Sequence, residues 1–259
     1  MLRAVQHRLM AFPAQDLTIW GIALALNGVL IALAQRLPLL TKAGWVHAGI
    51  LGTILWGCLG WRGWLAVVMY LVLGSLVTRV GLKRKQEKGL AEARGGRRSP
   101  ANVWGSAAVG ALIALLIGAG LEPVGLLLVG FAASFAAKLA DTFGSEIGKR
   151  WGRTTVLITT LRRVPAGTEG AVSLEGTLAS AAGSAVMTLV AVALQLVPAG
   201  PEALLVASVG LVATLIESVV GALVQERISW LSNELVNGLQ TAIAAMLAIV
   251  AANLLQHLG

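Results

Sequence analysis

The sequence has few residues for disulfides or histidine chemistry, and few charges of either sign. Among its 259 residues there are one cysteine and three histidines; Cys58 lies in an apolar segment, and the histidines are scattered. An intrachain disulfide is therefore excluded, and a histidine metal centre is not expected. Charged residues make up 12% of the chain and hydrophobic residues 57%, whereas about 25% of a soluble domain is charged. This composition is typical of a polytopic membrane protein.

Common catalytic signatures are missing as well. The segment 144–150 (GSEIGKR) is not a phosphate-binding P-loop, because its spacer is too short and no serine or threonine follows the lysine. No G-x-S-x-G turn and no histidine-based triad can be drawn. These absences exclude a soluble P-loop kinase and a triad hydrolase. The polar stretch 1–16 lacks a short apolar region with a cleavage site, so neither a cleavable signal nor a plastid transit peptide is expected.

The chain does contain a series of long apolar segments. A helix needs about 20 mostly apolar residues to cross roughly 30 Å of hydrocarbon. We therefore predict an all-α, polytopic transmembrane bundle, in which residues 1–259 form one integral-membrane domain. The eight expected spans lie near 17–35, 44–60, 63–81, 103–121, 123–140, 177–198, 203–224 and 238–256. Only Trp61-Arg62-Gly63 separates the second span from the third.

Positive charge is concentrated in two loops, which explains most of the formal net charge of +8. Residues 82–102 are expected to form one basic loop, and the loop after the fifth span carries further cations. The alternate loops hold almost none, so the positive-inside rule places both basic loops on the cytoplasmic side. The loop 225–237 then falls on that side, whereas Arg3 and Arg8 fall on the other. Topology and anionic ligands account for this charge better than a nucleic-acid partner does.

One helical face near the end of the fifth span is polar. At 100° per residue, Lys138, Asp141, Ser145 and Lys149 share this face, with Glu146 at its flank. Ionisable residues near membrane depth are costly and occur mostly inside a bundle or a watery cavity. The face therefore predicts a polar site, and the alternative is an ordinary helix end with Lys–Asp pairs.

This face opens a polar region, 141–176, which we predict to be an active-site loop. Its second half is the run RRVPAGTEGAVSLEG, from Arg162 to Gly176. Glycines let backbone N–H groups approach an anion closely, and arginine forks match phosphate oxygens. A basic cytoplasmic loop with no further role would explain the arginines but not the carboxylates and hydroxyls.

A third polar group lies near the C-terminus. Glu217 is embedded in an apolar helix, with Thr214 on its face, and Asn233, Asn237 and Gln240 form a stripe on the next helix. A buried glutamate needs a partner, a proton or a metal. Glu217 is therefore a candidate functional residue.

Four segments give the chain a family resemblance. They are 89–102 (GLAEARGGRRSPAN), 140–148 (ADTFGSEIG), 165–173 (PAGTEGAVS) and 217–237, which begins ESVVGA. In these segments, and over most of its length, the chain resembles the integral-membrane phytyl-phosphate kinase family of plants and cyanobacteria, which includes the transmembrane protein 19 group. The tail 173–177 (SLEGT) is more distantly similar to phytol and dolichol kinases and to membrane cytidylyltransferases.

The resemblance implies a Mg²⁺-dependent kinase that converts a prenyl (phytyl) monophosphate to its diphosphate, with CTP the favoured nucleoside triphosphate. The expected context is phytol metabolism and tocopherol biosynthesis, in a bacterial plasma or thylakoid membrane. The expected partners are a prenyl monophosphate lipid, a nucleotide and the bilayer. A homo-oligomer is compatible with this interpretation.

The resemblance and the polar pattern together imply roles for individual residues. The expected catalytic residues are Asp141, Glu146, Lys149 and Glu217. Mg²⁺ is a hard cation that prefers oxygen ligands, and its expected ligands are Asp141, Glu146, Glu175 and Glu217. Substrate and phosphate contacts are expected from Arg97, Arg98, Asn102, Lys138, Ser145, Arg150, Arg162, Arg163, Gly167, Thr168, Gly170, Ser173, Glu175, Asn233 and Asn237.

Two other classes of function fit part of the pattern. A CTP-dependent lipid-phosphate cytidylyltransferase or a prenol kinase would need similar polar residues. A transporter or flippase for a phosphorylated lipid would use Glu217 as a coupling residue. Transporters often carry paired repeats with broken helices near the midplane, whereas this sequence has no convincing internal repeat and its polar groups gather at one face.

Overall fold

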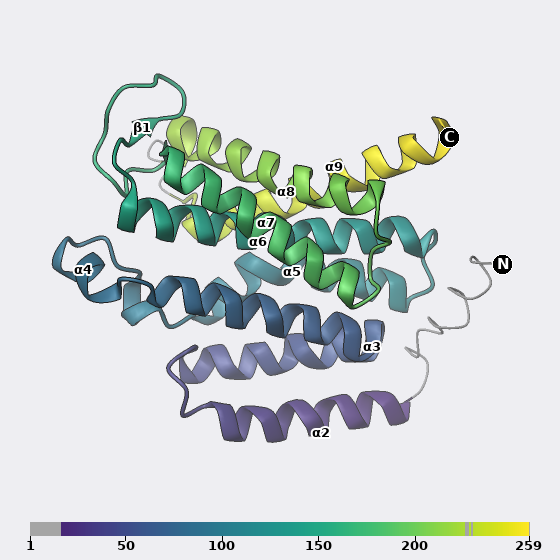
Figure 1. The fold of residues 1–259 in the computed structure, drawn as a ribbon. Helices are drawn as coiled ribbons and strands as arrows, with labels where there is room; N and C mark the ends of the chain where they lie inside the picture. Colours follow the sequence, from purple (N-terminus) through teal and green to yellow (C-terminus); the bar gives the residue numbers. More distant parts are fainter. Residues whose placement is uncertain (1–16, 226–227, 229, 259) are drawn as a thin grey trace.

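The computed structural model describes residues 17–225, 228 and 230–258, and over these ranges the chain is a bundle of helices (Figure 1). Seven of the helices are long and apolar enough to cross a membrane. This confirms the predicted all-α, polytopic membrane bundle. In chain order the elements are α2 (Leu17–Ala34), α3 (Lys42–Arg79), α4 (Leu82–Glu87), the 3-10 turn η1 (Ala93–Gly96), α5 (Pro100–Gly118), α6 (Val124–Trp151), β1 (Val156–Leu157), β2 (Ala171–Val172), α7 (Leu174–Ala193), α8 (Pro201–Val220), the π-helical turn η2 (Gly221–Gln225) and α9 (Asn233–Leu258).

The longest helix, α3, is folded back on itself. Its 38 residues would extend about 57 Å if straight, nearly twice the thickness of the hydrocarbon. The backbone breaks at Gly60, with φ 67° and ψ −168°, a conformation open essentially to glycine. Beyond the break the chain runs back toward the start of α3. The evidence is that Arg79 Nη2, at the end of the helix, donates to the Pro38 carbonyl oxygen at 3.1 Å. The halves of α3 correspond to the second and third expected spans, but the break falls at Gly60 and leaves Trp61–Gly63 helical.

One end of the bundle carries both basic segments. The labels α4 and β1 lie at this end in Figure 1, and the last turns of α9 lie at the opposite end. A backbone bridge between Leu40 and Arg98 joins the turn before α3 to the segment before α5. We call the end that carries residues 80–99 and 152–173 the polar end. Arg3 and Arg8 lie outside the described residues.

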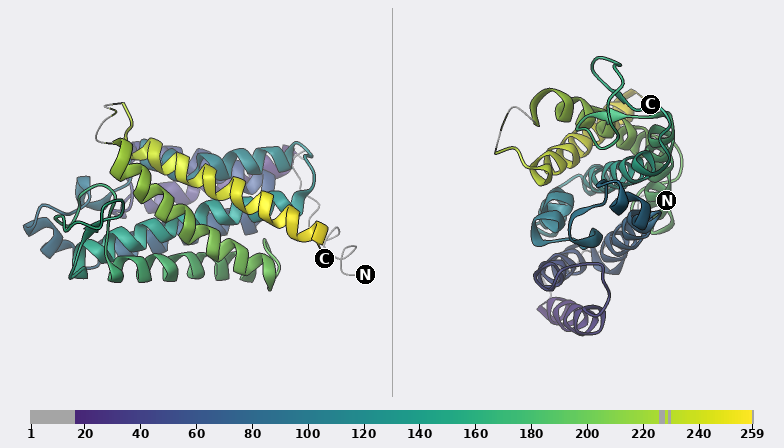
Figure 2. Two further views of the ribbon diagram at one scale, coloured as in Figure 1. Left: turned by 90° about the horizontal axis from the view of Figure 1, so that it is seen from above. Right: turned by 90° about the vertical axis from the view of Figure 1, so that its left-hand side faces the viewer.

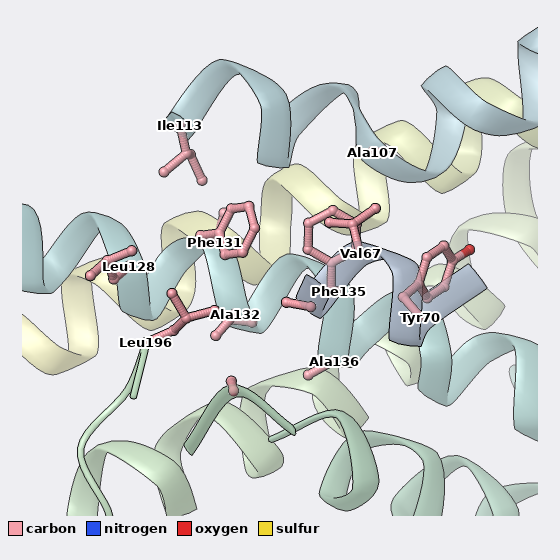
Figure 3. Close-up of a cluster of buried hydrophobic side chains, with 14 of the residues drawn as sticks. Val67, Tyr70, Ala107, Ile113, Leu128, Phe131, Ala132, Phe135, Ala136 and Leu196 are labelled. Atoms are coloured by element: carbon pink, nitrogen blue, oxygen red, sulfur yellow. The ribbon is translucent and has the colours of Figure 1, made fainter. Parts of the chain in front are cut away.

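Helix α6 is the central element of the bundle. It packs against α3, α5, α7, α8 and α9, whereas α2 lies at the edge against α3 (Figure 2). Phe131 and Phe135 lie at its middle beside Val67 and Tyr70 of α3 (Figure 3), and the Phe135 and Tyr70 ring centroids are 5.6 Å apart. Small side chains fill the remaining positions, which lets the neighbouring helices approach closely.

Glycines bring α6 unusually close to α7 near the polar end. A Cβ on Gly144 would lie 2.0 Å from Ser180 Oγ, and one on Gly176 would lie 3.0 Å from the Gly144 carbonyl oxygen. Gly148 faces Ser173 and Gly176 in the same contact. The glycines of the 140–148 motif therefore pack the two helices together, and they hold the polar face of α6 in a fixed orientation.

Two expected loops contain more regular structure than the sequence indicated. The basic region 82–102 includes α4 and η1, and α5 already begins at Pro100 because Ser99 and Asn102 form a capping box. In the region 141–176, α6 continues to Trp151, supported by its contact with α7, and α7 begins at Leu174. Ser173 caps α7 by accepting from the Gly176 N–H at 3.1 Å. The irregular part is residues 152–173, which contain the short β1–β2 pairing.

Candidate functional site

A cavity of about 520 Å³ opens at the polar end of the bundle. Its walls come from α3, α5, α6, α7, α8 and α9, together with the segments 89–98 and 166–173. Most of the residues that sequence analysis selected line it, although they are distant in the sequence. These are Arg97, Arg98, Asn102, Lys138, Asp141, Ser145, Glu146, Lys149, Gly167, Thr168, Gly170, Ser173, Glu217, Asn233 and Asn237.

The polar face of α6 forms the floor of the cavity. Lys138 donates to the Asp141 carboxylate, and its ammonium also lies 2.9 Å from the side-chain oxygen of Asn237 on α9. Lys138 is only 4% exposed, so this charge depends on partners within the bundle. The Lys–Asp pair that was the alternative interpretation is present, and both of its members line the cavity.

Glu217 faces this floor from α8. The charges that act on it are the like charges of Asp141 and Glu169 and the opposite charge of Lys138. One turn earlier, the Thr214 hydroxyl accepts from Gln240 Nε2 of α9 at 3.0 Å, and the same Nε2 donates to the Ala137 carbonyl oxygen at 3.2 Å, which links α8 and α6 through α9. The π-helical turn η2 follows directly after α8, and such turns are frequent at functional sites.

The loop 166–170 covers the cavity between η2 and the segment before α5. Gly170 has φ 71°, and a Cβ there would lie 2.4 Å from the Ala222 Cβ and 2.5 Å from the Ser218 carbonyl oxygen. Gly167 has φ 89° and faces Leu90. The loop therefore has the tight, glycine-dependent shape that its sequence predicted. Its Glu169 also lines the cavity.

Cations form the wall nearest to α3 and α5. Arg98 Nη1 donates to the Tyr70 hydroxyl at 2.7 Å, and its guanidinium lies 5.1 Å from the centre of the Tyr70 ring. Lys149 Nζ lies 3.0 Å from Glu92 Oε1. Two of these groups are thus held in place by side chains that sequence analysis had not assigned to the site.

The amide of Asn102 connects α5 to α9 across the same wall. Its Nδ2 donates to Glu234 Oε1 at 3.0 Å, and its Oδ1 accepts from the Ser99 backbone N–H at 2.9 Å. Glu234 lines the cavity together with Asn233 and Asn237, which follow the start of α9. Asn102 therefore has a helix-capping role in addition to its place in the cavity wall.

Four selected residues lie outside the cavity walls. Arg150 lies against Gly81, just before α4, and its guanidinium lies 5.1 Å from the centre of the Trp151 ring. Arg162 and Arg163 are exposed in the loop between β1 and β2. Glu175 lies beside Arg153, with Arg153 Nε 4.0 Å from Glu175 Oε1. Arg150 lies outside the cavity because adjacent helical residues point in directions that differ by 100°. Arg162 and Arg163 lie outside it because their loop turns outward.

Some important contacts were not foreseen. Lys85 of α4 donates to Glu146 and to the Thr78 carbonyl oxygen, and it is buried. Nothing distinguishes it in sequence from its basic neighbours. Tyr70 carried a usable signal, because it is the chain's only tyrosine and lies within an apolar span.

Two of the expected carboxylates have the chemistry to share a Mg²⁺ with phosphate oxygens of a ligand. In the described part of the chain, no group of three or more histidine, cysteine or acidic side chains could hold a metal alone. Glu146 is paired with Lys85 and fully buried, and Glu175 lies outside the cavity. Of the four expected ligands this leaves Glu217 and Asp141, whose carboxylate is paired with Lys138 but is 20% exposed at the cavity. Mg²⁺ commonly uses one or two carboxylates and completes its shell with phosphates and water. A cation there would also relieve the repulsion of Asp141 and Glu217.

The comparisons with known proteins agree with this architecture. The model of the family described as integral membrane protein DUF92 matches residues 25–245. An uncharacterized membrane protein of Synechocystis is 46% identical over 252 residues, which cover 96% of this chain and 95% of that protein. The chloroplastic protein VTE6 of Arabidopsis thaliana is 39% identical over 242 residues, 89% of this chain and 71% of that protein.

A more distant relative extends the comparison to archaea. An uncharacterized membrane protein of Methanocaldococcus jannaschii is 32% identical over 226 residues, 86% of this chain and 90% of that protein. No solved structure matches the chain. The family resemblance inferred from the sequence motifs is confirmed, and the chain belongs to the DUF92 family of integral membrane proteins.

Proposed function

We propose that this protein is a prenyl-phosphate kinase, which transfers the γ-phosphoryl group of a nucleoside triphosphate to phytyl monophosphate. CTP is the favoured donor, and the site faces the cytoplasm. The observation that carries the proposal is the cavity at the polar end, where carboxylates and cations from α6, α8, α9 and the segments 89–98 and 166–173 line one space. The family resemblance supplies the substrate class.

The proposed reaction needs charge neutralisation and alignment more than acid–base chemistry. An oxygen of the lipid phosphate forms a bond to the γ-phosphorus, the bond from that phosphorus to the β–γ bridging oxygen breaks, and the nucleoside diphosphate leaves. A phosphate monoester has a second pKa of about 6, so the acceptor is largely ionised near neutral pH. The protein's main tasks are to place the reacting groups in line and to stabilise their negative charge.

The cavity residues suit these tasks. Lys138, Lys149 and Arg98 present positive charge from two walls, and the Arg98 guanidinium is oriented by Tyr70. Asp141 and Glu217 would hold Mg²⁺, which neutralises phosphate charge when bound. Gly167 and Gly170 line the cavity, and glycine-containing turns let backbone N–H groups approach phosphate oxygens closely.

The position of the cavity also fits a lipid phosphate. The 28 residues of α6 extend about 42 Å, more than the roughly 30 Å of hydrocarbon. Its last turns, which carry Ser145 and Lys149, therefore reach the membrane edge. An acceptor with its chain in the bilayer and its phosphate at that edge could meet a nucleotide arriving from water.

The direct test is product analysis with purified protein, phytyl monophosphate, Mg²⁺ and labelled CTP, ATP or GTP. Label from the γ-position in a lipid diphosphate is the expected result. Transfer of only the α-label, with release of pyrophosphate, would identify a cytidylyltransferase instead. Transfer from no nucleotide to short or long prenyl phosphates would overturn the proposal in favour of transport.

A further inference from the structure

A buried ion pair lies beside the cavity and connects two of its walls. Lys85 is 1% exposed and Glu146 is 2% exposed, and the Lys85 ammonium donates to the Glu146 carboxylate. The same ammonium donates to the Thr78 carbonyl oxygen at 2.8 Å. The other cations of α4, Lys83 and Arg84, are exposed. Lys85 therefore differs from its neighbours in location, although all share one sequence pattern.

The ion pair attaches the segment 82–99, which we call the α4 segment, to the last turns of α6. Farther along this segment, Glu92 pairs with Lys149, one turn after Glu146 on α6. The far end of the segment is held by backbone hydrogen bonds, in which the Arg98 N–H donates to the Leu39 carbonyl oxygen at 3.0 Å. Between these attachments, Arg94, Gly95 and Gly96 all have positive φ, so the intervening turn contributes little regular structure.

We infer that Lys85 and Glu146 are positioning residues, which fix the α4 segment against α6 so that Arg98 and Lys149 reach the same cavity. In this role Glu146 is the charge partner of Lys85, and it does not bind metal. The inference deepens the proposed function. Its kinetic test depends on the proposed function, but its structural test does not.

A positioning role for Glu146 can be distinguished from a metal-binding role by the energetics of buried ion pairs. Removing one partner leaves an uncompensated buried charge and is strongly destabilising, whereas replacing both by apolar groups of similar size is often neutral. Methionine approximates the length of both side chains without charge. A pair that positions a segment therefore tolerates the double replacement, but a metal ligand does not.

The experiment compares Lys85→Met, Glu146→Met and the double variant with the wild type in detergent. The matched control is Lys83→Met, which removes an exposed lysine from the same helix. The structural readout is trypsin cleavage after Arg94, Arg97 and Arg98, sites that every variant retains, and the kinetic readouts are kcat/KM and the Mg²⁺ concentration for half-maximal activity. Cleavage in a folded protein reports local opening of the cleaved segment.

The expected result is non-additive. Each single variant should be cleaved at least about 10-fold faster and lose about 10-fold in kcat/KM, and the double variant should return to within about 3-fold of wild type. Half-saturation by Mg²⁺ should shift by less than about 2-fold, because a lost metal interaction typically costs 10-fold or more. Lys83→Met should match the wild type.

Two results would overturn the inference. Unchanged cleavage in both single variants would show that the pair does not hold the segment. A different pattern would assign Glu146 to the metal. In that pattern Glu146→Met abolishes activity, the double variant with Lys85→Met does not recover it, and any residual activity needs a higher Mg²⁺ concentration for half-maximal rate. If the wild type transfers no phosphoryl group, the proposed function fails, and the cleavage pattern alone decides the inference.

Discussion

Lys138 and Asp141 lie one turn apart on α6, and the Lys138 ammonium donates to both the Asp141 carboxylate and the Asn237 side chain of α9. Glu217 of α8 lines the same cavity, and the Lys138 charge acts on it without a direct ion pair. One lysine therefore lies close to both of the carboxylates that would hold Mg²⁺. The floor of the cavity combines a cation with two carboxylates at a depth where single charges would be costly.

This arrangement predicts an asymmetry between two substitutions. Lys138→Met leaves Asp141 and Glu217 facing one another without their cation, whereas Asp141→Asn leaves Lys138 with Glu217. Breaking a buried pair costs about 3–5 kcal/mol, and we expect Lys138→Met to approach that loss and Asp141→Asn to lose clearly less. Thermal unfolding of the purified variants in one detergent measures the difference. Equal losses would show that Glu217 does not use Lys138 as a partner.

The two carboxylates should be essential for turnover and dispensable for insertion. Asp141→Asn and Glu217→Gln should each lower kcat/KM by at least about 100-fold, since each removes charge stabilisation at the phosphates. Glu202→Gln is the matched control, because Glu202 lies on the same helix as Glu217 but in its first turn, at the opposite end. Full activity in both cavity variants would contradict the metal assignment.

The close contact of α6 and α7 predicts a steric effect with a specific rescue. Gly144→Ala places a Cβ 2.0 Å from Ser180 Oγ, and overpacking of this kind costs about 1–3 kcal/mol. Ser180→Gly in the same chain should restore most of the lost stability. Gly125→Ala, on the same helix with no neighbour within 4 Å, should behave like the wild type. A thermal-unfolding series decides this, and failure of the rescue would mean that the helices are not packed in this register.

The loop over the cavity should be intolerant of a side chain at Gly170. Gly170→Ala combines a positive φ of 71° with a clash against Ala222 and Ser218. The positive φ alone makes alanine less stable than glycine by about 1 kcal/mol. Gly120→Ala measures this backbone cost by itself, because Gly120 has φ 85° and open space around it. We expect Gly170→Ala to lose activity and Gly120→Ala to keep it. Comparable activity in both would show that the loop does not close the site.

The arrangement of spans can be checked by labelling single cysteines. The chain has one native cysteine, Cys58, which is buried, so Cys58→Ala gives a simple background. Cysteines at Lys83 and Arg163 should react with an impermeant reagent from the cytoplasmic side, and one at Leu121 should react from the other side. Labelling of positions 83 and 163 from opposite sides would refute the shared polar end.

The length of the apolar segments was enough to predict most of the fold. Eight spans were expected, and the structure has seven long helices, one of which is folded in two at Gly60. The ends of the helices were less predictable. α6 passes its apolar stretch by several turns because Gly144 and Gly148 give it a partner in α7, and this contact has no signature in hydropathy.

The site was predictable where periodicity or glycine chemistry specified it. Lys138, Asp141 and Lys149 share one cavity because helical spacing puts them on one face. The pairing of Lys85 with Glu146 was not predictable, since it joins residues 61 positions apart and depends on how α4 folds against α6. Arg162 and Arg163 were selected because arginine forks match phosphate oxygens, and the loop between β1 and β2 holds them away from the cavity.

The central claim is that this cavity transfers a phosphoryl group to a prenyl phosphate. The most direct measurement is lipid diphosphate formation from phytyl monophosphate and γ-labelled CTP, by wild type and Glu217→Gln purified side by side. The account predicts labelled lipid diphosphate with the wild type and almost none with the variant at equal amounts of folded protein. Equal product from both would trace the activity to a contaminant or another site, and no product from either would contradict the claim.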